Sequence, residues 1–203
     1  MPQLRLEGLT NTVLQGVSLH VVAGQIVCLS GASGSGKSCL LRALADLDAH
    51  QGQVWLDELE QQQCPAHQWR QRVRGVPAES QWWFDRVSDH FPADYDPQPF
   101  QAVGLPEAAL SWQVSRLSSG EKQRLALLRA LAYPLEVLLL DEPTANLDAT
   151  TALAVEQWLV AQIRQQAWPT LWVSHDPEQI QRVADAHWRM DAGQLKEVRH
   201  GRD

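Results

Sequence analysis

The chain has 203 residues, of which 44% are hydrophobic and 20% charged, and its net charge is −7 with a pI near 5.4. This composition excludes a disordered chain, and the length suffices for one globular domain. The acidic charge argues against a general nucleic-acid binder, because such a protein needs a basic surface that neutralises phosphates.

Apolar patterning predicts strands and one helix in the first third of the chain. Continuous or alternating apolar runs predict strands at 4–7, 17–22, 25–30 and 51–57, and helical spacing predicts a helix over 37–47. Residues 69–77 predict the end of a helix that leads into a short strand. Between 81 and 115, proline residues break the chain into short helical pieces, and we expect a small helical lobe at about 79–133.

The last third alternates regularly between helices and strands. The predicted elements are helices 119–132, 149–166 and 176–184, strands 136–140 and 169–174, and a terminal pair of strands around HWRMD and QLKEV. Strands that alternate with helices predict an α/β fold with a mostly parallel central sheet, and the N-terminal strands add an antiparallel part. We expect one domain over residues 1–203.

The cysteines and the N-terminus indicate the compartment. Cys28, Cys39 and Cys64 are an odd number without CxxC spacing, which favours buried, unreactive thiols over a disulfide framework or a zinc site. The residues after Met1 lack the basic region and the apolar core of a signal peptide, so we expect no secretory signal. No stretch has the roughly 20 predominantly apolar residues of a membrane span. We therefore expect a cytoplasmic protein that meets a membrane only through a partner.

Residues 31–38, GASGSGKS, follow the pattern G-x-x-x-x-G-K-[ST] between a predicted strand and a predicted helix. Glycines let backbone N–H groups turn toward phosphate oxygens, and the helix start adds a positive dipole end. Lys37 is predicted to reach the β- and γ-phosphates, and the Ser38 hydroxyl to bind Mg²⁺. A glycine-rich turn without a ligand is the alternative, and the flanking elements argue against it. The other predicted nucleotide contacts are Gly31, Ser33, Gly34, Ser35, Gly36 and Cys39.

Two adjacent acids, Asp141 and Glu142, end the predicted buried strand VLLL. Ligands of open α/β sheets bind at this end of the strands. Successive strand residues point to opposite faces, so the two carboxylates have different tasks. We expect Asp141 to hold Mg²⁺ and Glu142 to orient or deprotonate a hydrolytic water. The alternative is that the acids only cap the strand at a loop.

The segment LSSGEKQR, residues 117–124, makes the chain resemble ABC-type ATPase subunits, a class of P-loop NTPases. In that family this signature contacts the nucleotide of a second subunit, packed head to tail. The resemblance implies that Ser118, Ser119, Gly120 and Glu121 form a helix start that grips the γ-phosphate of ATP across the interface. A simple capping box between Ser118 and Glu121 is the alternative.

Further matches to the family extend over nearly the whole chain. The segment Ala145–Asp148 stands where the family has its D-loop, so Asp148 is expected at the dimer interface. His175, after TLWVS, matches the switch histidine, which contacts the γ-phosphate and the attacking water. A lone histidine at a strand end is otherwise structural. The expected catalytic residues are thus Lys37, Glu142 and His175, and the expected cofactors are ATP and Mg²⁺.

Three positions depart from the family pattern. Ala78 occupies the place of a glutamine that contacts Mg²⁺ and the transporter partner, and Glu79 or Gln81 are the candidate substitutes. Residues 1–54 contain no Phe, Tyr or Trp to stack on adenine, and the matching place is near Thr10 or Asn11. Ser119 replaces a signature glycine, a mild change unless a positive φ is needed. Because the other catalytic residues are present, we expect slow hydrolysis.

The aromatic run Trp82, Trp83 and Phe84 follows the altered glutamine position. In the family a groove at this place receives a cytoplasmic helix of the membrane subunit, and aromatic residues are favoured anchors in such grooves. The alternative is that these side chains pack inside the small lobe.

The resemblance favours an ATP-hydrolysing subunit that forms a homodimer and drives a separate permease, attached through it to the inner face of the membrane. The sequence is similar to a bacterial subunit assigned to iron export, and short ATPases that serve lipoprotein release or other export are the alternatives. Ser38 and Leu117 are too close for the long coiled coils of chromosome-type relatives, and ribosome-type relatives carry two ATPase units. A regulatory subunit with weak or no turnover stays open because of Ala78.

Overall fold

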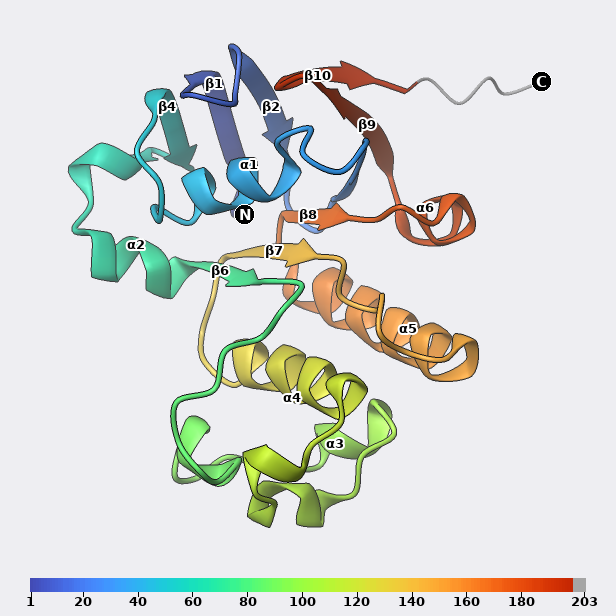
Figure 1. Ribbon diagram of the computed structural model, residues 1–203. Coiled ribbons are helices and arrows are strands. Elements are labelled where there is room, and N and C mark those ends of the chain that lie inside the picture. Colours follow the sequence, from blue (N-terminus) through green and yellow to red (C-terminus); the bar gives the residue numbers. More distant parts are fainter. Residues whose placement is uncertain (199–203) are drawn as a thin grey trace.

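The computed structural model describes residues 1–198, which form two sheets and the helices around them (Figure 1). The larger sheet has six strands in the order β10-β9-β3-β8-β7-β6. Its strands are β3 (Ile26–Ser30), β6 (Val73–Val76), β7 (Val137–Asp141), β8 (Thr170–Val173), β9 (Ala186–Asp191) and β10 (Gln194–Glu197). All neighbours in this sheet pair in parallel except β9 and β10, which form an antiparallel pair at the edge.

The smaller sheet is antiparallel and comes from the N-terminal part of the chain. Its order is β2-β1-β4-β5, with β1 (Leu4–Thr10), β2 (Val17–Val21), β4 (Gln51–Leu56) and β5 (Leu59–Glu60). Leu4 and Leu6 point inward while Arg5 and Glu7 are exposed, as one buried face requires. The α/β fold with a parallel sheet and an antiparallel N-terminal part is therefore confirmed.

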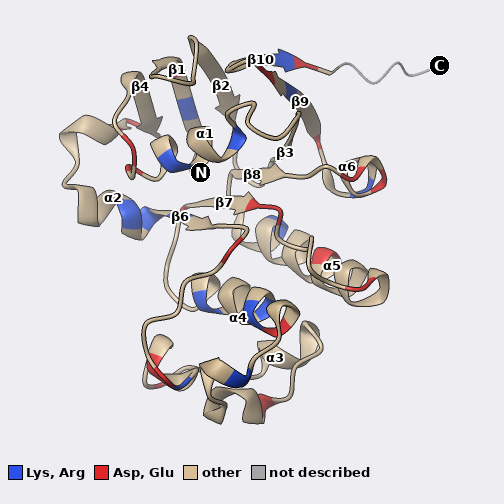
Figure 2. Cartoon of the chain, viewed as in Figure 1, with Lys and Arg blue, Asp and Glu red and all other residues tan. Residues whose placement is uncertain are grey.

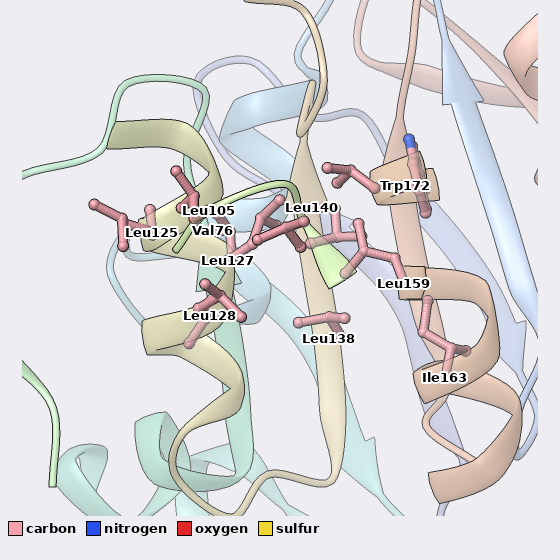
Figure 3. Packing of buried hydrophobic residues seen from close by; sticks show 14 of the residues in the cluster. Val76, Leu105, Leu125, Leu127, Leu128, Leu138, Leu140, Leu159, Ile163 and Trp172 are labelled. Carbon is pink, nitrogen blue, oxygen red and sulfur yellow. The ribbon is translucent and has the colours of Figure 1, made fainter. Parts of the chain in front are cut away.

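Helices cover both faces of the six-stranded sheet. They are α1 (Lys37–Leu44), α2 (Ala66–Arg72), α3 (Pro99–Ala102), α4 (Ser119–Leu131), α5 (Ala149–Gln166) and α6 (Pro177–Val183). Leu138 and Leu140 of β7 pack with α4 and α5, as Figure 3 shows, while the alternate residues Val137 and Leu139 pack with α1. Burial on both faces explains why β7 reads as an unbroken apolar run.

Between β6 and α4 the chain forms short turns of helix. These are 3-10 turns at Ser88–His90, Glu107–Ser111 and Val114–Arg116, together with α3. Phe91 and Phe100 from this segment join the cluster that α4 and α5 share with the sheet. The segment therefore lies on the same side of the six-stranded sheet as α4, below the sheet in Figure 1.

Two expectations need correction. The prediction of buried thiols holds for Cys28, which is fully buried and whose pKa burial raises to about 12, but Cys39 and Cys64 are only half-buried. The strand predicted at 51–57 ends at Leu56, and a turn at Asp57 leads into the unpredicted two-residue strand β5. Within residues 1–198, no helix has the length and apolar character needed to cross a bilayer.

Candidate active site

Four neighbouring parallel strands bring the predicted site residues to one edge of the sheet. The strands β3, β8, β7 and β6 lie side by side and point the same way. The phosphate loop, His175, Asp141 and Ala78 follow or end these strands in turn. Because carboxyl ends of parallel strands share an edge, residues far apart in sequence form one site.

The loop between β3 and α1 depends on glycine. Gly31 has φ +142° and Gly36 has φ +113°, values that side chains rarely adopt. A Cβ on Gly31 would lie 2.2 Å from the carbonyl oxygen of Met190, and one on Gly36 would lie 3.1 Å from Met190 Sδ and Val13 Cγ1. The two glycines therefore allow the loop to pack closely against β9 and the N-terminal loop.

Lys37 fills the centre of this loop. Its Nζ donates hydrogen bonds to the carbonyl oxygens of Gly31, at 2.8 Å, and Ala32, at 3.1 Å. Burial lowers the pKa of the ammonium, while Glu142 and Asp141 act in the opposite direction. The buried hydroxyl of Ser35 has no hydrogen-bond partner among the described residues. A buried cation and an unused buried hydroxyl at a helix N-terminus match the requirements of a phosphate group.

Ser38 and Asp141 meet although they lie far apart in the sequence. The Ser38 hydroxyl donates a 2.7 Å hydrogen bond to Asp141 Oδ2. A hydroxyl and a carboxylate beside a phosphate-binding loop are oxygen ligands of the kind that Mg²⁺ uses together with substrate phosphates. The residues present therefore fit both a nucleoside triphosphate and Mg²⁺, and the bound ion would supply positive charge against the phosphates.

Glu142 and His175 form the second pair at this edge, with 2.9 Å between Glu142 Oε1 and His175 Nε2. Glu142 adopts φ +49°, in the left-handed region, where the chain leaves β7. This turn directs Glu142 to His175 while Asp141 reaches Ser38. The structure thus separates the two carboxylates, and places a potential general base beside an imidazole at the phosphate end of the site.

The signature segment forms the N-terminus of α4. The capping box is present: Glu121 N donates to Ser118 Oγ at 3.2 Å, and Ser118 N donates to Glu121 Oε2 at 2.8 Å. The hydrogen bonds that Ser118 N and Ser118 Oγ donate to Glu121 Oε2 lower the pKa of the Glu121 carboxyl. The N–H groups of Ser119 and Gly120 have no acceptor within residues 1–198. Ser119 is not among the positive-φ residues, so the replaced glycine leaves no strain.

The signature and the phosphate loop lie on opposite sides of the six-stranded sheet. Helix α1 packs with the cluster on one face, and α4 with the cluster on the other, as Figure 1 shows. The start of α4 instead contacts the predicted D-loop: a Cβ on Gly120 would lie 3.2 Å from Asn146 O and Leu147 Cδ2. Asp148 caps α5 by accepting from Thr151 N at 3.0 Å, and this hydrogen bond lowers the pKa of its carboxyl.

The altered positions also occupy defined places. Ala78 lines a hollow of about 400 Å³ that Ser38 and Asp141 share, and both candidate substitutes, Glu79 and Gln81, line the same hollow. At the other end of the site, Asn11 Oδ1 accepts from Val13 N and Leu14 N, and its amide lies 3.3 Å from Cys39 Sγ.

The aromatic run divides between the two interpretations. Trp82 packs against the core cluster, whereas Trp83 is 64% exposed and Phe84 is 50% exposed. Two unpredicted residues hold this run: Arg129 stacks on Trp82 and Trp83, and His90 Nε2 accepts hydrogen bonds from Trp83 N and Phe84 N. The spacing of these residues carried no motif that indicated the contacts.

Comparison with known proteins identifies the family of the chain. The sequence matches the family described as ABC transporter over residues 14–145. The aliphatic sulfonates import ATP-binding protein SsuB of Pseudomonas putida is 37% identical over 191 residues, which are 90% of this chain and 69% of that protein. YjkB of Bacillus subtilis (strain 168) is 33% identical over 204 residues, covering 95% of this chain and 81% of that protein.

A solved structure of a bacterial Atm1-family ABC exporter with ATP bound superposes with a TM-score of 0.86 at 24% identity. The match covers 97% of this chain, but the chain spans only 38% of the exporter chain, so this likeness bears on the fold alone. With the family match over residues 14–145 and relatives of above 30% identity, the chain belongs to the ABC transporter family, as one of its ATP-binding, ATP-hydrolysing subunits.

Proposed function

We propose that this chain hydrolyses ATP as a head-to-tail pair of subunits and thereby drives a separate membrane-spanning permease, which holds it at the inner face of the membrane. The observation that carries the proposal is the position of the signature. Its unused N–H groups at Ser119 and Gly120 lie across the sheet from Lys37. A second copy supplies the missing phosphate loop.

Each residue of the site then has one task. Lys37 and the loop around it bind the β- and γ-phosphates, while Ser38 and Asp141 hold Mg²⁺. Glu142 accepts a proton from the attacking water, and His175 orients Glu142 and the γ-phosphate. The 2.9 Å contact between Glu142 and His175 supports this pairing.

A mixing experiment tests whether the signature acts across the pair. The Lys37→Ala variant lacks a phosphate contact but keeps its signature, while Ser119→Glu keeps its phosphate loop and adds a negative charge where an anion should bind. A mixed pair contains one intact composite site, so we expect two inactive variants to recover part of the ATPase activity when combined. Sites completed within one chain would show no recovery, and that result would contradict the proposal.

A second experiment detects the dimer directly. Glu142→Gln removes the proton acceptor while keeping the shape of the side chain, so ATP and Mg²⁺ should trap a dimer in light scattering. Glu136→Gln, at a partly exposed position directly before the same strand, is the control and should stay monomeric after turnover. A Glu142→Gln variant that stays monomeric with ATP, alone and beside its membrane partner, would overturn the pairing.

Ala78 supports a second candidate function, a regulatory subunit that binds ATP and turns over slowly or not at all. The two candidates differ in one measurement, which is steady-state phosphate release by the chain together with its membrane partner. Since Glu79 and Gln81 share the hollow with Ser38 and Asp141, we expect turnover.

In this proposal the permease determines which cargo is transported. Iron export stays a prediction from the sequence resemblance, whereas SsuB is named as an aliphatic sulfonates import protein. Transport assays on vesicles with the co-purified membrane protein should therefore compare both cargoes and both directions.

A further inference from the structure

A hollow of about 590 Å³ lies beside the catalytic pair, and Glu142 and His175 are part of its lining together with residues of α5 and α6. Three polar side chains of this lining are almost completely buried: Thr144 is 8% exposed, Glu156 2% and Gln179 5%. Buried polar side chains need hydrogen-bond partners, and the partners show which segments these three hold together.

The amide of Gln179 joins three parts of the molecule. Its Nε2 donates to Thr144 Oγ1 at 2.7 Å and to Glu156 Oε1 at 2.6 Å, and its Oε1 accepts from Trp172 Nε1 at 3.3 Å. The indole N–H can only donate, so it requires the amide oxygen and leaves both amide N–H groups for the other two residues. One side chain of α6 thereby connects β8, α5 and the turn after β7.

The hydrogen bond between Gln179 and Thr144 has its two ends next to the two members of the catalytic pair. Thr144 lies two residues after Glu142, in a turn in which Ala145 N donates to Glu142 O at 3.3 Å. Gln179 lies four residues after His175, on the helix that directly follows the His175 loop. The turn with Glu142 and the loop with His175 leave different strands, and the amide of Gln179 ties one to the other.

Glu156 fixes the direction of this amide from the side of α5. Its Oε2 accepts from Arg182 Nε at 3.0 Å, and its Oε1 accepts from Arg182 Nη2 at 3.3 Å. The hydrogen bond to Glu156 raises the pKa of Arg182. Apolar residues of similar size often replace a buried ion pair without loss of stability, so stability alone does not account for this one. A buried carboxylate does, however, hold an amide N–H firmly in one direction.

We propose that Gln179 is a positioning residue of the ATPase. Its amide holds the turn with Glu142 against the helix behind His175, and so keeps the Glu142 carboxylate at the imidazole and at the attacking water. Glu156 and Arg182 keep the amide in the direction that this contact needs. The inference deepens the proposed function and rests on it, because it assumes the roles given there to Glu142 and His175.

Removal of the amide tests the link. Gln179→Met keeps the length of a buried side chain but loses all three hydrogen bonds. We expect kcat to fall at least about tenfold while KM changes less than about twofold, because a displaced catalytic group slows the reaction while the phosphate loop stays intact. Gln181→Met, at an exposed position of the same helix, is the matched control and should leave both constants unchanged. Equal losses in the two variants would contradict the proposal.

An exchange of the two side chains tests the hydrogen bond itself. When Glu156→Gln is combined with Gln179→Glu, the amide at position 156 donates to the carboxylate at position 179, and the Thr144 hydroxyl and the Trp172 N–H can donate to it as well. We expect this double variant to have a kcat within about threefold of the wild type, whereas Glu156→Gln with Gln179→Met should stay slow. An exchanged variant that folds but is no faster than Gln179→Met overturns the inference.

A double-variant cycle distinguishes positioning from a general loss of stability. His175→Ala removes the group through which Gln179 acts, so the addition of Gln179→Met should slow single-turnover hydrolysis no further. A similar additional loss in both backgrounds would show that Gln179 acts independently of the pair. If Gln179→Met does not fold, Thr144→Val cuts the same link from its other end with little change of shape, and should lower kcat at constant KM.

The same measurements separate this inference from the proposed function. If Glu142→Gln and His175→Ala hydrolyse ATP as fast as the wild type, the proposed roles of the pair fail, and the positioning role of Gln179 fails with them. If both variants are slow while Gln179→Met and Thr144→Val keep the wild-type kcat, only the positioning role is wrong.

Discussion

The loops that follow β3 and β6 leave the same edge of the sheet but are shaped by different means. The loop after β3 depends on its backbone: glycines with positive φ wrap Lys37, and a Cβ on Gly31 would clash with the backbone of β9. The loop after β6 depends on side chains, with Arg129 and His90 holding it through rings and hydrogen bonds. Basic positions lie along α4 and α2, which flank this second loop (Figure 2).

The difference explains which loop a sequence pattern can describe. A loop whose shape depends on its backbone tolerates few residue types at each position, so its residues form a recognisable motif. A loop that distant side chains hold can vary, provided that the partners vary with it. The first loop agrees with the family pattern, and the second is where Ala78 departs from it.

Lys37→Ala gives the largest expected effect on the first loop. Removing the buried ammonium takes away the only positive side chain inside the loop, and we expect ATPase activity to fall by about 100-fold or more. Phosphate release and nucleotide binding by the purified protein measure this loss. Lys196→Ala, at an exposed position on β10, should leave both unchanged. Equal losses in the two variants would mean that net charge, and not the loop, controls binding.

Gly31→Ala breaks the same loop through its backbone. The new Cβ would lie 2.2 Å from Met190 O, on a residue with a φ of +142°. We therefore expect the free energy of unfolding to fall by about 2 kcal/mol or more. Gly75→Ala is the matched control in the second region, because a Cβ added there would have no heavy atom within 4 Å. Thermal unfolding without nucleotide compares them, and similar melting temperatures would contradict the distinction between the loops.

The sequence predicted much of this molecule because local patterns decide much of it. Helix 149–166 lies where its apolar spacing indicates, and the structure adds Asp148 as its N-terminal cap. The strand end at Asp141 and the signature helix also lie where their patterns place them. The stacking of Arg129 on Trp82 and the contact of Gly120 with the D-loop join distant segments, and no local preference specifies such contacts.

Ala78→Gln sharpens the comparison by restoring an amide to the second loop. Position 78 lines the hollow that contains Ser38 and Asp141, so a glutamine there would add a polar contact beside the proposed Mg²⁺ site. One hydrogen bond to a charged group justifies a gain in turnover of up to about tenfold. Ala78→Leu adds similar bulk without an amide and should give no gain. ATPase rates over a range of Mg²⁺ concentrations would show the effect, and an equal gain in both variants would attribute it to packing.

The smallest expected effect is a pH dependence that belongs only to the second loop. Burial lowers the pKa of His90 below its ordinary value of 6.5, and Arg129 lowers it further, while its hydrogen bond to Arg86 O and the Asp89 charge oppose this. The unfolded chain therefore binds a proton at a higher pH than the folded chain does. The stabilising contribution of neutral His90 is complete above about pH 6.5 and decreases as the pH falls through the lower, folded-state pKa.

Protonation would also remove the acceptor that Nε2 offers to Trp83 N and Phe84 N, so the segment around Trp83 and Phe84 should loosen in acid before the phosphate loop does. Melting temperatures between about pH 7.5 and about pH 5.5 measure the effect, with His67→Gln as an exposed control and His90→Phe as the variant without the titrating group. We expect His90→Phe to be less stable at neutral pH but to lose less on acidification. If that variant lost as much stability on acidification as the wild type, a group other than His90 would cause the pH dependence. The second loop would then depend on its rings and on Arg129 alone.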